Sequence, residues 1–239
     1  MIVLTSINSI RESLRVGNVS QLYYSAAKEN FPLVVEAKKA GIPVKLASAQ
    51  ELDTLSRANK HQGIVALSAD KEPCSVHDII AKAQGKPYPL VLILDGIQDP
   101  HNLGAVLRVC DAFGVDGLVI KSKGEVPLNA TVARVSTGAI EYIDVAVVAN
   151  LNQAISELKD AGYGVVGAEG SAEKCVEEVD YRRPMALVIG SEGFGISHAV
   201  LSKCDEVVKI PMHGHVNSLN ASVSAGIVIS QIDLLRRMK

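Results

Sequence analysis

The feature that most constrains the fold is a series of apolar, β-branched runs that recurs along the second part of the chain. The runs are LVLILD (90–95), GLVIK (117–121), YIDVAVV (142–148), YGVVGA (163–168), ALVIG (186–190) and EVVKIP (206–211). Helical patterns separate most of them. Continuous apolar strands that alternate with helices predict a parallel sheet that is covered on both faces. In such a sheet, ligands bind beyond the carboxyl ends of the strands.

The first part of the chain shows shorter alternating elements. We expect strands in VSQLYYSA, IPVKLA and QGIVALSA, and helices in FPLVVEAKKAG and AQELDTLSRA. The stretch 71–89 contains three prolines and one glycine, which favour turns and loops. The sequence therefore predicts an α/β protein with a small module over 1–70, a linker with one short helix over 71–88, and a parallel-sheet domain over 89–239.

The composition is that of an ordinary globular protein, with 48% hydrophobic and 21% charged residues over 239 positions. No apolar run approaches the ~18 residues that suggest a membrane span, and the N-terminus lacks the pattern of a signal peptide. We therefore expect a cytoplasmic protein without a membrane partner. The four cysteines form no Cys-x-x-Cys pair and the histidines lack zinc-ligand spacing, so we expect no metal.

The formal net charge of −2 argues against a protein that is coated with nucleic acid over its whole surface. The charge is divided unevenly, because residues 1–88 carry +3 and residues 89–239 carry −5. A mildly basic N-terminal part joined to an acidic C-terminal part is consistent with an N-terminal module that contacts phosphate groups and a C-terminal catalytic domain.

Two common nucleotide-binding loops are excluded. A Rossmann dinucleotide domain needs Gly-x-Gly-x-x-Gly after its first strand, and LILDGIQDPHNLGAV does not match it. GSEGFGIS (190–197) has the glycine spacing of a phosphate loop, but Ile196 stands where the lysine must be. Glu192 would also place a negative charge beside the phosphates. We therefore exclude nucleotide hydrolysis.

The loop after 90–95 enters a helix through the turn signal Asp99-Pro100. Asn102 is either the N-cap of this helix or a residue that faces a ligand. Arg108 lies off the apolar face of the helix, with Gly104 one turn before it leaving open space beside the guanidinium. Arg108 is either a solvent-exposed partner of Asp111 or a functional arginine.

Two later loops carry further candidates. Gly190, Gly193 and Gly195 permit close backbone approach, and Glu192 lies among them. The segment IPMHGHVNSLNASVSAGI enters the last helix with a surplus of small polar residues, namely Asn217, Ser218, Asn220, Ser222 and Ser224. One N-cap residue would suffice for the helix, so the surplus predicts that this backbone also meets a ligand.

Taken in order, DPHNLGAVLR, VIGSEGFGIS and IPMHGHVNSLNASVSAGI resemble the three motifs of the SpoU (TrmH) family of SPOUT methyltransferases, over residues 90–239. Members of this family transfer a methyl group from S-adenosylmethionine to a ribose 2′-hydroxyl in tRNA or rRNA. The N-terminal part, including HQGIVA (61–66), resembles a small ribosomal-protein-L30-like module. This module precedes the catalytic domain in the 23S rRNA guanosine 2′-O-methyltransferase (RlmB) subgroup.

The resemblance implies that the C-terminal part is a SPOUT domain with a deep trefoil knot, in which the three loops stack and hold S-adenosylmethionine. The positions that it implies for cofactor binding are Gly190, Ile210, Met212, Leu219, Thr137 and Gly138. The positions that it implies for catalysis are Arg108, Asn102, Glu192, Ser218 and Asn220.

The resemblance assigns the attack of the 2′-hydroxyl to Arg108, with Asn102 nearby. Either the arginine assists deprotonation of the hydroxyl, or it binds the adjacent phosphate and polarises the hydroxyl. A guanidinium stays charged in proteins, which makes a literal base awkward. Glu192, Ser218 and Asn220 would orient the ribose and the arginine.

We therefore expect a homodimeric, S-adenosylmethionine-dependent enzyme that methylates the ribose of a guanosine in 23S rRNA. A tRNA ribose methyltransferase is one alternative, although the simplest tRNA enzymes of the family lack an N-terminal module. A non-catalytic RNA-binding assembly factor is the other, although Arg108, Glu192 and Asn220 are all present. The six tyrosines and three phenylalanines are few for base stacking, and Tyr23 and Tyr24 either stack a base or pack in the core.

Overall fold

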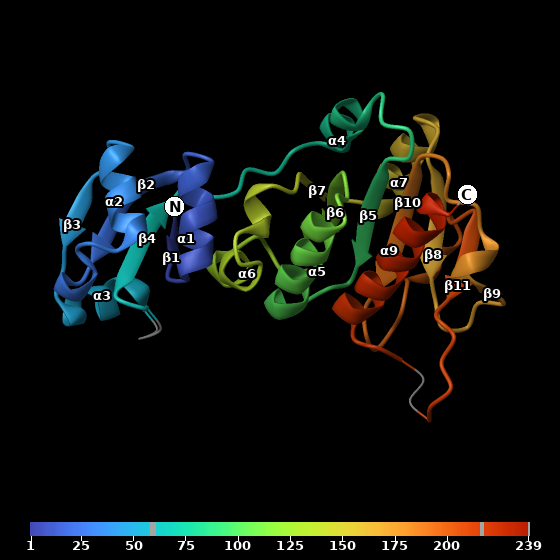
Figure 1. Ribbon diagram of the computed structural model, residues 1–239. Coiled ribbons are helices and arrows are strands. Elements are labelled where there is room, and N and C mark those ends of the chain that lie inside the picture. The colour runs from blue at the N-terminus through green and yellow to red at the C-terminus, as the bar shows by residue number, and fades with distance from the viewer. Residues whose placement is uncertain (58–60, 216–217, 239) are drawn as a thin grey trace. The chain divides into compact units, whose positions relative to one another are not determined.

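The computed structural model describes residues 1–57, 61–215 and 218–238 (Figure 1). The chain forms two compact units. The N-terminal unit comprises Met1–Glu72 and Leu128–Tyr142, and the C-terminal unit comprises Pro73–Pro127 and Ile143–Lys239.

The N-terminal unit contains a four-stranded sheet in the order β1-β4-β2-β3. Its strands are β1 (Ile2–Leu4), β2 (Val19–Tyr24), β3 (Val44–Leu46) and β4 (Ile64–Ser68). Its helices are α1 (Ile7–Arg15), η1 (Ala26–Lys28), α2 (Pro32–Lys39), α3 (Ala49–Ser56), α6 (Ala130–Val135) and η2 (Ala139–Glu141). The five elements predicted between residues 19 and 68 are confirmed. Among the described residues β3 pairs only with β2 and is therefore an edge strand.

Local sequence signals explain the helices of this unit. Pro32 occupies the first turn of α2, where its missing N–H costs no hydrogen bond. Ser48 and Glu51 form a reciprocal capping box at the start of α3, with the Ser48 N–H donating to Glu51 Oε2 at 2.7 Å.

The segment 128–142 packs with the N-terminal unit, although the sequence analysis placed it in the domain 89–239. Ser9 Oγ on α1 donates a buried hydrogen bond of 2.9 Å to the Ala133 carbonyl on α6. Asn18 Nδ2 donates to Glu141 at 2.6 Å. These contacts join residues more than 120 positions apart, so no local pattern announces them.

The C-terminal unit contains a seven-stranded sheet in the order β7-β6-β5-β10-β8-β11-β9, and every pairing is parallel. Its strands are β5 (Leu90–Asp95), β6 (Gly117–Lys121), β7 (Val145–Val148), β8 (Gly164–Ala168), β9 (Lys174–Cys175), β10 (Met185–Gly190) and β11 (Glu206–Lys209). The predicted parallel α/β sheet is confirmed. β5 and β10 lie at its centre and are buried along nearly their whole length.

Helices cover both faces of this sheet. They are α4 (Val76–Ala83), α5 (Pro100–Ala112), α7 (Leu151–Asp160), η3 (Val176–Glu178), α8 (His198–Leu201) and α9 (Ala221–Arg237). A buried cluster joins one face to α4, α7 and α8. On the other face α5 and α9 pack against each other, in front of the sheet in Figure 1. No helix in the described ranges is long and apolar enough to span a membrane.

The stretch 71–88, which was expected to be a linker, belongs mostly to the C-terminal unit. The C-terminal unit begins at Pro73, and α4 is part of its core because Val76 and Ile79 are 3% and 0% exposed. Ile79 packs onto Gly117 at the start of β6, where an added Cβ would lie 2.5 Å from its side chain. The short helix was predicted, but its burial makes it part of the sheet domain.

Candidate active site

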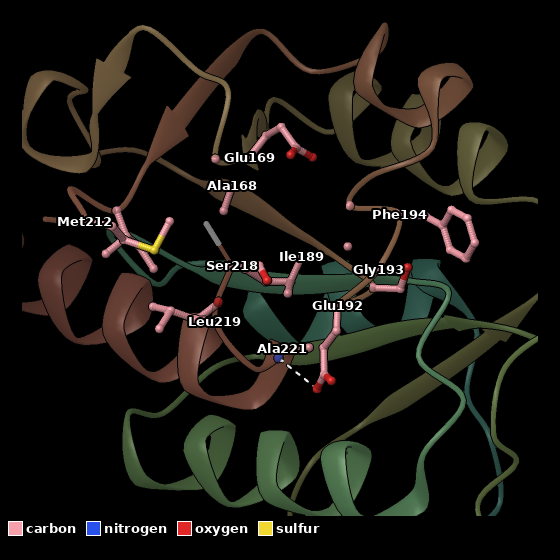
Figure 2. A pocket seen from close by; sticks show the side chains of 16 residues that line it. Ala168, Glu169, Ile189, Glu192, Gly193, Phe194, Met212, Ser218, Leu219 and Ala221 are labelled. Carbon is pink, nitrogen blue, oxygen red and sulfur yellow. Dashed lines mark hydrogen bonds between the residues drawn. The ribbon is translucent and has the colours of Figure 1, made fainter. Parts of the chain in front are cut away.

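A cavity of about 530 Å³ lies where β8, β10 and β11 end (Figure 2). Its lining comes from residues 168–170, from 189–195 and from six residues between 210 and 224. It includes six of the residues predicted for the site, namely Gly190, Glu192, Ile210, Met212, Ser218 and Leu219. In Figure 2 Met212 and Leu219 line one side and Gly193 and Phe194 the other. The position agrees with the rule that parallel sheets bind ligands at the carboxyl edge.

Gly190 allows the loop after β10 to fold back on itself. Ser191 and Gly195 exchange two backbone hydrogen bonds of 3.1 and 2.9 Å, which close a tight turn. A Cβ on Gly190 would lie only 2.1 to 2.3 Å from backbone atoms of Gly195 and Ile196. Gly195 has a φ of +64°, which favours glycine. Gly190 therefore shapes one wall of the cavity through the loop that it admits.

Three predicted residues from separate loops form one hydrogen-bonded cluster beside the cavity. Asn102 Nδ2 and Asn220 Nδ2 both donate to Glu192 Oε1, at 2.8 and 2.6 Å. Asn220 Nδ2 also donates to Asn102 Oδ1 at 2.8 Å. The backbone N–H of Ala221 adds a weaker bond of 3.3 Å to the same carboxylate oxygen, drawn in Figure 2. All three side chains thus hold one another in place.

The caps of the two helices explain why these side chains are free to meet. Asp99 caps α5 by accepting the His101 N–H at 2.8 Å, so Asn102 is not the N-cap and points its amide toward Glu192. Asn220 is the N-cap of α9, because its Oδ1 accepts the N–H groups of Ser222 and Val223. Its Nδ2 remains available for Glu192. Asn220 therefore serves both capping and the cluster, while Ser218 and Ser224 line the cavity.

Asp95, the last residue of β5, binds the C-terminal end of the loop over residues 190–197, which we call the glycine loop. Its Oδ2 accepts the Ser197 N–H at 2.8 Å, and its Oδ1 accepts Lys121 Nζ at 2.8 Å. Burial by itself would raise the pKa of Asp95, but the hydrogen bonds from Lys121 and Ser197 outweigh it and lower the pKa below its ordinary value. The carboxylate therefore stays ionised and holds the loop against the sheet.

Arg108 lies on the exposed side of α5, as the helical spacing predicted. Within the described ranges it forms no ion pair, and the alternative pairing with Asp111 is not observed. Gly104, by contrast, is buried, so the expectation that it leaves open space beside the guanidinium is wrong. The guanidinium is thus left available for a ligand.

Thr137 and Gly138 belong to the N-terminal unit, and the cavity described above is lined by residues of the C-terminal unit. A Cβ on Gly138 would lie 2.6 Å from the side chain of Glu12 on α1. Thr137 has a φ of +52°, and a β-branched residue in this region is strained in a way that often marks a functional turn. Their assignment to the cofactor stays a prediction. Asn217 lies outside the described residues.

The structure adds lining residues that the sequence analysis did not single out. Glu169, directly after β8, accepts the Ile196 N–H at 3.1 Å and borders the cavity. Phe194, at the tip of the glycine loop, is 96% exposed. The rule that ligands bind beyond strand ends applied to 168–170 as well, but this segment carries no distinctive residue pattern.

The lining favours a ligand with positive charge and an apolar part. Two carboxylates, Glu169 and Glu192, contribute to it, while no lysine, arginine or histidine of the described ranges does. Ile189, Ile210 and Leu219 supply apolar surface. A polyphosphate would find no counter-charge here, in agreement with the exclusion of nucleotide hydrolysis. In the part of the chain that the structure describes, no three His, Cys, Asp or Glu side chains are grouped to hold a metal ion.

Comparison with known protein families decides the classification. The model of the SpoU rRNA methylase family matches residues 89–230, which include the cavity and the cluster. The chain belongs to the SpoU methylase family. A second model, RNA 2′-O ribose methyltransferase substrate binding, matches residues 7–74. The suspected resemblance is therefore confirmed for both parts of the chain, and this SpoU protein is an RNA methyltransferase.

Known proteins resemble this SpoU chain over most of its length. YacO of Bacillus subtilis, which carries the name of a TrmH family tRNA/rRNA methyltransferase, is 45% identical over 82% of this chain and 79% of its own. A solved RNA 2′-O ribose methyltransferase superposes with a TM-score of 0.78 at 25% identity, covering 99% of this chain and 89% of its own. AviRb of Streptomyces viridochromogenes, a SpoU methyltransferase solved with AdoMet, shares the fold with a TM-score of 0.82 at 24% identity, covering 98% and 89%.

Proposed function

We propose that this protein transfers a methyl group from S-adenosylmethionine to the ribose 2′-hydroxyl of a guanosine in 23S rRNA. The observation that carries the proposal is the cluster of Asn102, Glu192 and Asn220 beside a cavity with acidic and apolar lining. The cluster brings the three sequence motifs together at one place. The exposed Arg108 lies on the same helix as Asn102.

The cavity suits S-adenosylmethionine in size and chemistry. Its volume of about 530 Å³ lies within the range of ordinary small-molecule sites. Ile210 and Leu219 would pack on the adenine, the narrow wall made by Gly190 would bring backbone groups close, and the carboxylates would favour the cationic end. The cofactor supplies the methyl group that is transferred.

The residues of the chain orient the 2′-hydroxyl and handle its proton. A free ribose hydroxyl is hardly ionised at neutral pH, so it needs positioning and an acceptor for its proton. Glu192 Oε1 is occupied by the cluster, while Oε2 has no hydrogen bond within the described ranges and can accept one from the ribose. Arg108 would bind the adjacent phosphate and stabilise the alkoxide as it develops.

The target proposed is rRNA, and the N-terminal unit supports it. That unit matches a substrate-binding family model, and residues 1–72, with nine Lys+Arg and seven Asp+Glu, carry a net charge of +2 that suits an RNA partner. The names of the relatives cover both tRNA and rRNA, so tRNA is the second candidate. The reaction takes place in the cytoplasm, where both RNAs are made and modified in bacteria such as those of the named relatives.

A homodimer is part of the proposal. α9 exposes Val223 at 47% and Leu234 at 51%, and their spacing of eleven residues places them on the same side of the helix. A two-fold axis through such an apolar stripe would bury it in both copies. Leu234→Glu should yield a monomer in light scattering, whereas Leu46→Glu in the N-terminal unit should leave the dimer intact.

The proposal is tested with purified protein, labelled S-adenosylmethionine and RNA from bacterial cells that lack the protein. The expected product is 2′-O-methylguanosine in 23S rRNA after digestion to nucleosides. Label in the tRNA fraction alone would show that the target is tRNA and not rRNA, and would leave the proposed methyl-transfer reaction unchanged. A lack of label in either RNA, with a folded protein that binds S-adenosylhomocysteine, would support the non-catalytic assembly factor instead.

A further inference from the structure

A second cavity, of about 540 Å³, lies entirely within the N-terminal unit. Its walls are the edge strand β3, the helix α3 and Tyr23 of β2. Ala47 and Leu55 give it apolar surface, and Leu46, Gln50 and Thr54 lie at its rim. We propose that this cavity binds an unpaired nucleobase of the RNA substrate, with the base stacked on Tyr23. The proposal deepens the function proposed above and rests on it.

Tyr23 is suited to stacking because it is only partly buried. Its neighbour Tyr24 is 7% exposed and packs in the core, while Tyr23 packs against the small cluster of Ala47, Leu52 and Val65 and borders the cavity. Its hydroxyl donates to Gln21 Oε1 at 3.0 Å, which fixes the ring. A fixed, half-exposed aromatic ring at the wall of a cavity is a platform for an unstacked base.

Charge favours RNA as the occupant. Lys45 lines the cavity with its ammonium 6.0 Å from the centre of the Tyr23 ring. Two further lysines of the unit lie over aromatic rings, Lys38 over Tyr24 at 5.3 Å and Lys28 over Phe31 at 4.5 Å. Lys45 lies over the ring on a long, flexible side chain, so in the proposed complex the base takes its place on the ring and the ammonium turns to the phosphate as a counter-charge.

The rim supplies hydrogen-bonding groups for the edge of a base. Glu51 uses Oε2 to accept from the Ser48 N–H and hydroxyl, so Oε1 has no partner within the described ranges and remains an acceptor. β3, as an edge strand, also leaves backbone groups on one side that pair with no other described strand. Leu46 is 64% exposed there, and a base in the cavity would cover it.

The test measures the affinity of the full-length protein for rRNA from cells that lack it, at one fixed salt concentration. Tyr23→Leu keeps the apolar packing and removes the ring. Leu46→Glu places a negative charge at the exposed rim without disturbing the core. Each should weaken binding by about tenfold, the scale of one lost base stack. Val16→Glu makes the same change of charge at another exposed apolar site of the unit, and its affinity should stay near that of the wild type.

Two readouts separate this proposal from the function on which it rests. Both variants should keep their affinity for S-adenosylhomocysteine and their kcat at saturating RNA, with a raised KM for RNA. A wild-type protein that binds rRNA but transfers no methyl group would contradict the proposed function. The base-binding cavity would then be tested by the rRNA affinities of the variants. Unchanged rRNA affinity in folded Tyr23→Leu and in Leu46→Glu would overturn the proposal, as would an equal loss in Val16→Glu. If Tyr23→Leu fails to fold, Leu46→Glu decides alone.

Discussion

Asn220 donates a hydrogen bond of 2.6 Å to Glu192 while its own oxygen caps the last helix of the protein. One side chain thus fixes both the entrance of α9 and the carboxylate of the glycine loop. Asn102 on α5 completes the arrangement with bonds of 2.8 Å to each of the two. Changes to these residues should therefore affect the site in ways that depend on which atom is altered.

Asn220→Asp should separate capping from the cluster. Aspartate is as good an N-cap as asparagine, so the thermal midpoint should change little. The substitution removes the two Nδ2 donors and sets a second carboxylate beside Glu192. Methyl transfer should fall by about tenfold or more, the scale of a lost hydrogen bond to a charged group. Asn150→Asp is the control, since Asn150 caps α7 in the same manner, away from the cavity. Equal activity of the two variants would contradict the role of the cluster.

Gly190→Ala should impair cofactor binding by moving the glycine loop. The added Cβ would meet backbone atoms of Gly195 and Ile196 at 2.1 to 2.3 Å, so the turn must open. Overpacking of this kind costs about 1–3 kcal/mol, which corresponds to a loss of affinity of about five- to 150-fold. Gly193→Ala in the same loop meets nothing within 4 Å and should bind normally. Calorimetry with S-adenosylhomocysteine compares the two, and equal affinities would show that the shape of this loop is irrelevant to the ligand.

Arg108→Ala should lose catalysis without losing structure. The side chain is exposed and unpaired within the described ranges, so the free energy of unfolding should change by no more than about 0.5 kcal/mol. Single-turnover methyl transfer should drop by about a hundredfold or more, with unchanged affinity for S-adenosylhomocysteine. Arg108→Lys keeps the positive charge but loses the planar guanidinium. If lysine restores methyl transfer, the charge alone is sufficient. If it does not, the reaction needs the bidentate hydrogen bonds of the arginine. Near wild-type transfer by Arg108→Ala would remove this residue from the mechanism.

Asp95 should make the stability of the protein depend on acid pH. Its pKa in the folded protein lies below the ordinary value of an aspartate, so its contribution is complete above that ordinary value. The contribution is lost as the pH falls through the folded-state pKa. Denaturant titrations should therefore show a smaller loss of stability on acidification in Asp95→Asn than in the wild type. Parallel pH profiles of the two proteins would contradict the ion pair with Lys121.

The central strands of the C-terminal sheet follow directly from the sequence. LVLILD and GLVIK coincide with β5 and β6, because strands covered on both faces need apolar residues at every position. The association of 128–142 with the N-terminal unit could not be predicted, because it depends on contacts such as that of Ser9 with Ala133. The trefoil knot implied by the family resemblance stays a prediction.

The site was predictable where its residues have distinctive types and spacing. Three glycines lie around Glu192, and several asparagines and serines precede α9. Neither group fits the residue pattern of a helix or a strand, so both were recognisable from the sequence. Glu169 does not, because a single glutamate after a strand is usually a surface charge. The bond from Asn102 to Glu192 was equally hidden, because 90 residues separate the two and only the folded sheet brings their loops together.

The most direct test of the account is a map of ribose methylation in total RNA from bacterial cells that lack the protein. The account predicts that one guanosine of 23S rRNA loses its 2′-O-methyl group, and that expression of the wild-type protein restores it. Arg108→Ala, produced at the same level, should not restore the modification. An unchanged methylation pattern in 23S rRNA, or full restoration by Arg108→Ala, would contradict the account.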